Sequence, residues 1–185
     1  MTRKTTAHMF YTLNGVAEHA DRWQFDSFGP DEMQSMAEMT TATTDLVLGR
    51  TLWQEWSGFW PGAQDPFAEW VNPVRKHVLT STLAGELPWN STIVAGDPAE
   101  YLEQLRQQPG GDIAIAGGVE TTRRLVLAGL VDELTLTIHP VITGEGRRLF
   151  DDSVPTTRIR LLSSTHTQAG NIIATYALRS DDAAA

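Results

Sequence analysis

Three short segments of the chain share a layout that suits the binding of phosphate groups. In each, an apolar run is followed at once by small, hydroxyl-bearing or charged residues: Leu48-Gly49-Arg50-Thr51, Leu79-Thr80-Ser81-Thr82 and Ala116-Gly117-Gly118-Val119-Glu120-Thr121. Glycine lets a ligand approach the backbone because it has no Cβ. A helix that begins at such a turn offers free N–H groups to an anion. The segments predict a phosphate-binding edge, although a glycine pair before a helix is about equally often only a tight turn.

Arg50 is the cation best placed to contact such a phosphate, because it follows a predicted strand and adjoins Gly49. A guanidinium can pair with two phosphate oxygens at once. The alternative is a surface salt bridge, which contributes little. The chain contains no G-x-G-x-x-G, no G-x-x-x-x-G-K-[ST] and no Tyr-x-x-x-Lys, so the usual Rossmann, P-loop and short-chain dehydrogenase motifs are excluded.

On the substrate side, the candidates for a catalytic role are Asn14, Asp31 and Glu32. The two acids fall in the first turn of a helix predicted from Pro30 to about Thr41. Acids at that end complement the helix dipole, and we favour this interpretation over a carboxylate that anchors a heterocyclic substrate.

Aromatic residues supply the remaining candidates for a substrate cleft. Trp23 and Phe25 lie on the loop after the first predicted strand, where they either wall a cleft or anchor the loop. Trp53, Trp56 and Trp60 recur at nearly helical spacing, which is typical of a core-facing or dimer-facing stripe. Trp53 is also a candidate for the cleft.

Composition narrows the class of protein. The 185 residues suit one domain, expected over residues 1–180 with a frayed tail at 181–185. A net charge of −9 argues against a nucleic-acid partner. The chain has no cysteine, which excludes disulfides and thiol catalysis.

The five histidines of the chain are scattered, so we expect no metal site. We expect His139, next to Pro140, to be structural. No segment resembles a signal peptide or a membrane span, and we expect a cytoplasmic protein.

The apolar pattern alternates strands and helices and then finishes in strands. Strands are predicted at 5–13, 46–48, 77–79, 92–94, 113–115, 133–140, 159–165 and 172–178, and helices at 30–41, 51–60, 98–107 and 119–127. This order predicts an α/β fold with a mostly parallel central sheet of about eight strands, helices on both faces and an antiparallel C-terminal edge.

Taken in order, the motifs resemble those of the dihydrofolate reductase superfamily. Gly49-Arg50-Thr51-Leu52-Trp53 is similar to its second-strand motif, Leu79-Thr80-Ser81 to its third cofactor strand, and Ala116-Gly117-Gly118 to its Gly-Gly turn. The riboflavin-type reductase domain is the closest group. Its C-terminal signature is similar to residues 129–134, to His139-Pro140-Val141-Ile142 and to Gly144-Glu145-Gly146. The resemblance spans roughly residues 5–178 and implies this fold, NADPH as cofactor and a homodimer.

Two departures from the riboflavin-type pattern affect the substrate side. Asn14 stands where that group usually has Asp, and Ala116 where it usually has Glu. Without cysteine the chain also has no zinc deaminase half. The sequence therefore predicts an NADPH-dependent reductase of a small heteroaromatic (pterin- or pyrimidine-like) or carbonyl substrate. The alternatives are a non-catalytic dinucleotide- or ligand-binding module that kept the fold, and a structural dimer without a nucleotide.

Overall fold

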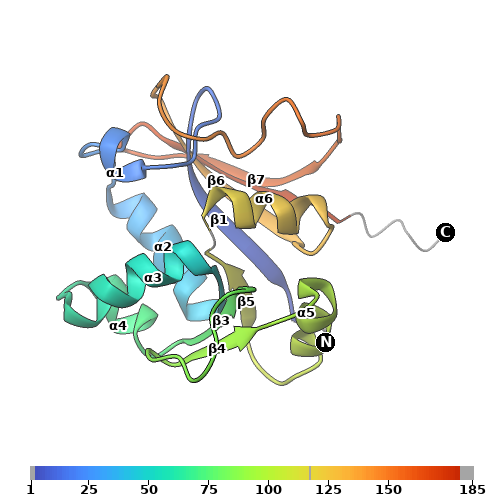
Figure 1. Cartoon of the computed structure of the whole chain (residues 1–185). Helices are drawn as coiled ribbons and strands as arrows, with labels where there is room; N and C mark the ends of the chain where they lie inside the picture. Colours follow the sequence, from blue (N-terminus) through green and yellow to red (C-terminus); the bar gives the residue numbers. More distant parts are fainter. Residues whose placement is uncertain (1–2, 117, 180–185) are drawn as a thin grey trace.

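The structure is a computed structural model that describes residues 3–116 and 118–179. In this part of the chain, eight strands form one sheet in the order β4-β3-β2-β5-β1-β6-β8-β7 (Figure 1). The strands are β1 (Thr5–Thr12), β2 (Thr43–Gly49), β3 (Arg75–Leu79), β4 (Ser91–Val94), β5 (Asp112–Ile115), β6 (Glu133–His139), β7 (Arg160–His166) and β8 (Ile172–Ala177). The helices are α1 (Ala20–Trp23), α2 (Pro30–Ala42), α3 (Arg50–Phe59), η1 (Trp60–Gly62), α4 (Pro66–Val71), α5 (Pro98–Arg106) and α6 (Val119–Leu127).

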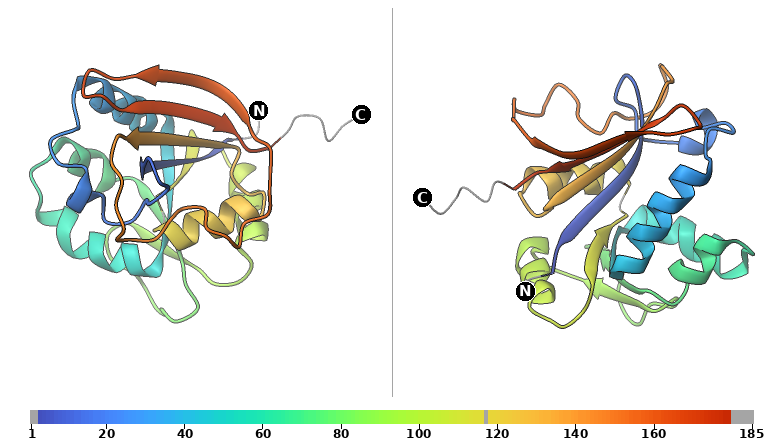
Figure 2. Two further views of the ribbon diagram at one scale, coloured as in Figure 1. Left: turned by 90° about the horizontal axis from the view of Figure 1, so that it is seen from above. Right: turned by 180° about the vertical axis from the view of Figure 1, so that it is seen from behind.

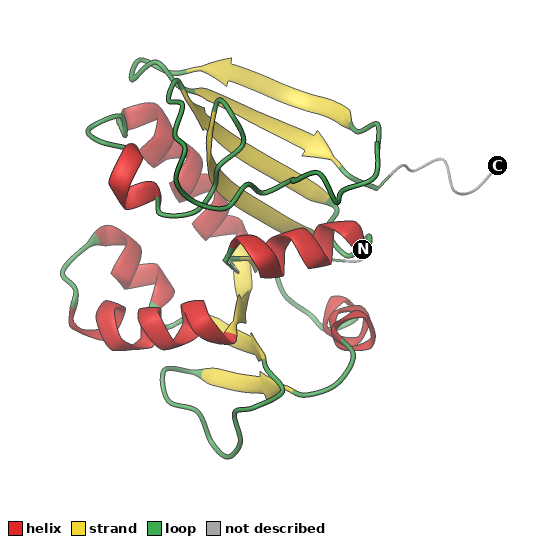
Figure 3. Cartoon of the chain, turned by 45° about the horizontal axis from the view of Figure 1, so that its top comes forward, coloured by secondary structure: helices red, strands yellow, loops and turns green. Residues whose placement is uncertain are grey.

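The sheet has the predicted mixture of directions. Strands β4, β3, β2, β5, β1 and β6 pair in parallel, whereas β8 pairs antiparallel to both β6 and β7. Crossovers between parallel strands are nearly always right-handed. The chain moves one way along the sheet from β1 to β4, then returns through β5 to β6, so the two sets of helices must cover opposite faces. Figures 1 and 3 show α2, α3 and α4 on one side and α5 and α6 on the other.

Successive side chains of the central strands point to opposite faces of the sheet, so a separate hydrophobic core forms on each face. Val47 packs with the buried apolar side chains of α5 and α6, whereas its neighbours Leu46 and Leu48 pack with Trp53 and the α3–α4 aromatics. In β5, Ile113 likewise faces the first cluster. A strand whose successive side chains are all buried is typical of a sheet covered on both faces.

The two margins of the sheet are β4 and β7, so the Thr-rich strand β6 lies inside the sheet, between β1 and β8. Strand β7 forms the C-terminal margin (Figure 2, left), and all seven of its residues are exposed. The short helices α1 and α4 were not predicted, because four to six residues carry too little periodicity to identify.

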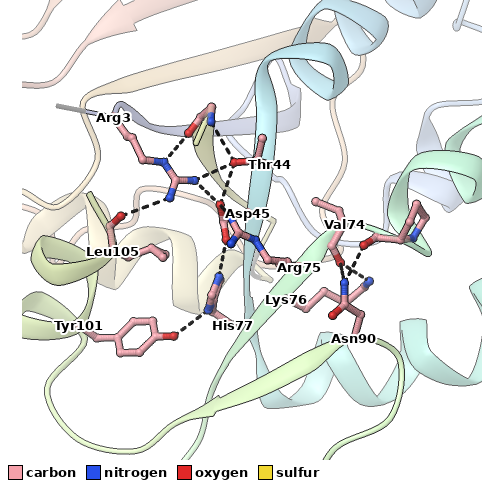
Figure 4. A network of polar contacts seen from close by, with 12 residues as sticks. Arg3, Thr44, Asp45, Val74, Arg75, Lys76, His77, Asn90, Tyr101 and Leu105 are labelled. Carbon is pink, nitrogen blue, oxygen red and sulfur yellow. Dashed lines mark hydrogen bonds and ion pairs between the residues drawn. The ribbon is translucent and has the colours of Figure 1, made fainter. Parts of the chain in front are cut away.

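A buried polar network ties together the amino-terminal ends of the parallel strands. Asp45 is fully buried, and its carboxylate accepts hydrogen bonds from Arg3, from Arg75 at 2.8 Å and from His77 at 2.8 Å. The other ring nitrogen of His77 lies 2.8 Å from the hydroxyl of Tyr101 on α5 (Figure 4). The network joins β2, β3 and α5 at the end of the sheet opposite to the strands' carboxyl ends.

Candidate functional site

The three sequence segments singled out above meet at the carboxyl ends of β2, β3 and β5. Gly49 pairs with Leu79 in the parallel register, and Val47 pairs with Ile115. The amide of Ala116 donates to the carbonyl of Val47 at 3.0 Å. In open α/β sheets, ligands bind outside the carboxyl ends of the strands, where the strand order reverses. Here β2 and β5 are neighbours whose following helices, α3 and α6, lie on opposite faces.

Two helix N-termini are available at this edge. Helices α3 and α6, of ten and nine residues, have Gly49 and Gly118 as N-caps, and neither helix has a side-chain cap hydrogen bond. Their first N–H groups are therefore left for solvent or a ligand, and an anion is the favoured partner. A Cβ on Gly49 would collide with the side chain of Thr121. Glycine at this position thus lets the start of α6 lie against the end of β2. Gly117 lies outside the described residues.

Arg50 supplies a positive charge beside these N-termini. Its guanidinium Nη1 donates to the hydroxyl of Thr82 at 2.8 Å, and both side chains are exposed. The hydroxyl of Thr80 accepts from the amides of Thr82 and Leu83, both at 3.1 Å, and so shapes the turn after β3. Ser81 is exposed on the same turn. This arrangement places the guanidinium of Arg50, at the start of α3, beside the hydroxyl groups of Ser81 and Thr82 on the turn after β3.

The remaining predicted residues on α6 and α3 have different roles. Val119 is buried in the core, so only its backbone can face a ligand. Glu120 and Thr51 are exposed in the first turns of their helices. Arg123 does not face a phosphate site, because its guanidinium is bonded to the carboxylate of Asp151 at 2.5 Å and to nearby loop carbonyls.

The two acids of α2 lie in different environments. The carboxylate of Asp31 accepts the amide of Gln168 at 2.8 Å, on the turn between β7 and β8. Glu32 is buried, and its oxygens accept from the Gly29 amide at 2.8 Å and from Asn171 Nδ2 at 2.7 Å. Burial alone would raise the pKa of Glu32, but hydrogen bonds from Thr167, Asn171 and Gly29 lower it below its usual value. Glu32 is therefore a buried, ionised carboxylate, and its bond with the Gly29 amide also caps the start of α2.

Asn14 holds two loops together. Its Oδ1 accepts from the Thr12 hydroxyl at 2.9 Å and from the Thr143 amide at 3.2 Å, and its Nδ2 donates to the Thr143 carbonyl at 2.8 Å. These contacts join the turn after β1 to the loop after β6. The side chain is half-buried and its polar atoms are engaged in this loop contact.

The aromatic candidates separate into a covered residue, an exposed residue and a core residue. Trp23 is buried, and its indole N–H donates to the carbonyl of Glu18 at 2.8 Å. Phe25 is 76% exposed. Trp53 packs in the core and donates to Ser91 Oγ at 2.9 Å, so the structure gives it a packing position. A pocket of about 250 Å³ adjoins Trp23, lined by Glu18, His19, Arg22, Thr143, Glu145 and Gly146.

Sequence reasoning missed a polar group on the α2 face of β1 and β6. His8 Nε2 lies 2.9 Å from Thr137 Oγ1, and burial lowers the pKa of His8 to about 4. His139 is fully buried at the end of β6 and packs edge-on against Phe10 and Trp23. Its burial could have been predicted from its place in an apolar, alternating strand, but its neighbours come from distant segments.

The match to known proteins covers most of the chain. Residues 3–173 match the family model of the RibD C-terminal domain. The chain belongs to the RibD C-terminal domain family. It is 26% identical to the uncharacterized protein YyaP of Bacillus subtilis (strain 168), over 94% of both chains.

Solved structures show the same fold at lower identity. A candidate riboflavin biosynthesis protein from Shewanella sp. PV-4 superposes with a TM-score of 0.76 at 19% identity, covering 96% of this chain and 98% of the other. Dihydrofolate reductase from Enterococcus faecalis, solved with NADP(H), superposes with a TM-score of 0.62 at 17% identity, covering 96% and 98%. The chain thus has the dihydrofolate-reductase-like fold and a riboflavin-type reductase domain, which supports an oxidoreductase. Within the described residues, no helix is long and apolar enough to cross a membrane.

Proposed function

We propose that this RibD C-terminal domain protein is an NADPH-dependent reductase of a small heteroaromatic substrate, pterin-like or pyrimidine-like, or of a small carbonyl compound. The observation that carries the proposal is the convergence of two helix N-termini without side-chain caps, beside Gly49 and Arg50, at the carboxyl edge of the sheet. A dinucleotide carries several phosphate groups, and this edge concentrates what phosphates bind.

The residues present fit such a cofactor. The amides that open α6 at Gly118, Val119 and Glu120 would hold the pyrophosphate, and Gly49 lets this start of α6 lie against the end of β2. Arg50 with Ser81 and Thr82 would hold the additional phosphate that distinguishes NADPH from NADH. The bound nicotinamide supplies the hydride, and the protein orients the ring and excludes water.

The candidate residues on the substrate side are held by hydrogen bonds to other parts of the chain. Asn14 is committed to Thr12 and Thr143, and Asp31 to the turn at Gln168. Glu32 is also bonded, to Gly29 and Asn171, but it differs in carrying a buried negative charge. We therefore propose that Glu32, rather than Asn14 or Asp31, contributes to substrate binding, and that the proton for the reduced product comes from water near the pocket beside Trp23.

A non-catalytic dinucleotide-binding module is the second candidate. The engagement of Asn14 in a loop contact favours it, because the position usually occupied by an acid in riboflavin-type reductases presents no free polar group here. This candidate shares the cofactor site with the first and differs in turnover alone.

We also propose that the protein acts as a cytoplasmic homodimer that joins through β7. Both the strand's outer hydrogen-bonding edge and its apolar side chains support this, since Leu161 is 52% and Leu162 41% exposed. An exposed strand edge pairs readily with another chain.

Oxidation of NADPH against a panel of pterins, aminopyrimidines and small carbonyl compounds tests the function. We expect turnover with at least one planar heterocycle, and saturable NADPH binding without substrate. Binding without any turnover would favour the non-catalytic module, and absence of binding would refute both candidates. Arg158→Ala, on the segment before β7, is the control variant that should leave binding unchanged.

A further inference from the structure

The imidazole ring of His139 is buried and unpaired within the described part of the chain. Its exposed fraction is zero, and among the described residues neither ring nitrogen has a hydrogen-bond partner. Most buried polar side-chain atoms in proteins are bonded, because leaving one unpaired costs stability. An apolar residue of similar size at this position would avoid that cost. The histidine thus needs an explanation other than packing.

Two aromatic rings and one polar pair lie near the imidazole of His139. The ring centroid of Trp23 lies 5.5 Å from that of His139, and the ring of Phe10 lies 5.9 Å away, both nearly perpendicular to it. The β6–β8 register pairs Ile138 with Ile172, so the next position along β8 brings Asn171 beside His139. Asn171 in turn holds the buried carboxylate of Glu32.

We propose that His139 is a substrate-binding residue, and that it hydrogen-bonds an uncharged, flat heteroaromatic ring that enters where the indole of Trp23 now covers it. This proposal rests on the proposed reductase function and deepens it, because it identifies a residue that selects the substrate class.

The chemistry of the group favours an uncharged ring. Burial lowers the pKa of His139, although the carboxylate of Glu32 acts in the opposite direction. The neutral imidazole presents one N–H donor and one acceptor nitrogen, so it can pair with a ring N–H, a ring nitrogen or a carbonyl. The nearby negative charge of Glu32 disfavours carboxylate or phosphate groups at this position. Phe10 supplies an aromatic contact for a flat ring, which would take the place that the Trp23 indole now occupies beside His139.

The segment that covers His139 has strained ends. His19 and Phe25, on either side of α1, have φ angles of 55° and 50°. Non-glycine residues in this left-handed region carry a conformational cost. Moving the segment would uncover the ring, and the pocket beside Trp23 provides space for the displaced indole.

The test compares wild-type protein with His139→Leu, using 6-aminouracil and pterin as probes. If His139 serves the ligand, the leucine variant should melt about 2–12 °C higher than wild type, because an unpaired polar group has been removed. It should also lose the upward Tm shift that either probe produces in wild type. With NADPH and a reducible probe, kcat/KM should fall about 10–100-fold.

Three further variants make the result specific. His139→Gln keeps one donor and one acceptor, so it should retain part of the probe-induced shift. His166→Leu, on the exposed strand β7, should change neither stability nor binding. Trp23→Phe should remove the probe-dependent change in tryptophan emission, which identifies Trp23 among the six tryptophans as the one that moves.

The outcomes separate this inference from the proposed function. If NADPH fails to bind wild-type protein, the proposed function is wrong, whereas the probe-induced shift still tests His139. If NADPH is oxidised and His139→Leu turns over as fast as wild type, the inference is wrong by itself. Absence of any probe-induced shift in wild type, or a lower Tm for His139→Leu, also overturns it.

Discussion

Replacing Asp45 with asparagine should strongly destabilise the fold. The carboxylate is fully buried and accepts bonds from Arg3, Arg75 and His77 (Figure 4). The amide removes the negative charge but leaves the side chain of Arg3, which is 3% exposed, in place. Removing one partner of a buried ion pair typically costs about 3–5 kcal/mol. For a chain of this length that corresponds to a decrease in Tm of about 6–20 °C.

The exposed pair Lys4–Glu133 is the matched control. Its nitrogen and oxygen lie 2.6 Å apart, with side chains 57% and 26% exposed. Glu133→Gln makes the same chemical change at the protein surface and should lower the free energy of unfolding by only about 0–1 kcal/mol. Urea unfolding of the three proteins at neutral pH gives the comparison. If Asp45→Asn costs no more than Glu133→Gln, the network does not stabilise the fold in the way argued.

The pH dependence of unfolding gives an independent check on Asp45. Burial alone would raise its pKa, but hydrogen bonds from His77, Arg3 and Thr44, with the charge of Arg3, lower it well below the usual range. A carboxyl whose folded pKa is depressed stabilises the protein fully above its unfolded pKa of about 4. That contribution is lost as the pH falls further. Wild-type stability should therefore decrease more steeply below pH ~4 than the stability of Asp45→Asn does.

Other parts of the structure give three further predictions. Burial lowers the pKa of Lys76 to about 8 in the folded protein, whereas its unfolded pKa is about 10.5. Between these two pH values the unfolded chain binds more protons than the folded one, so wild-type stability should rise by about 2–3 kcal/mol with increasing pH. Urea unfolding of Lys76→Met should show no such rise. Gly49→Ala should weaken NADPH binding about 10-fold in calorimetry, because the added methyl group meets Thr121 and displaces the start of α6. Adding Thr121→Ala should restore part of the affinity. An unchanged Kd for Gly49→Ala would contradict this prediction. Leu161→Lys on β7 should convert a dimer to a monomer in light scattering, whereas Leu127→Lys on α6, equally an exposed leucine, should not; a wild-type monomer at micromolar concentration would disprove the dimer.

The sequence predicted the sheet well because its signals are local. Strands such as Leu46–Leu48 are short apolar runs between turn residues, and helices such as α2 and α5 begin with proline at the first positions. The antiparallel C-terminal edge was predicted as well, but the order of the strands within the sheet was not. Nothing in residues 133–140 shows that β8 will pair with β6, because strand order depends on contacts between distant segments.

In the candidate site, too, the sequence predicted the features that depend on neighbouring residues and not those that depend on distant segments. The motifs at Gly49 and Gly118 could be recognised because a turn followed by a helix has a local signature. The environment of Glu32 could not, since its partner Asn171 is 139 positions away. His139 was expected to be structural, and its lack of hydrogen bonds could be seen only once Phe10 and Trp23 had been placed around it.

Calorimetric titration of NADPH and NADH into wild-type protein and Arg50→Ala, at two salt concentrations, tests whether this edge of the sheet binds a dinucleotide. Because one charge-assisted hydrogen bond contributes about 1.5–3 kcal/mol, NADPH should bind wild type about 10–100-fold more tightly than NADH. Arg50→Ala should lose most of that preference, and salt should weaken it since Arg50 is exposed. Equal loss of both cofactors in Arg50→Ala would mean that Arg50 contacts the shared pyrophosphate. Failure of wild-type protein to bind either cofactor would contradict the assignment of this edge as a dinucleotide site.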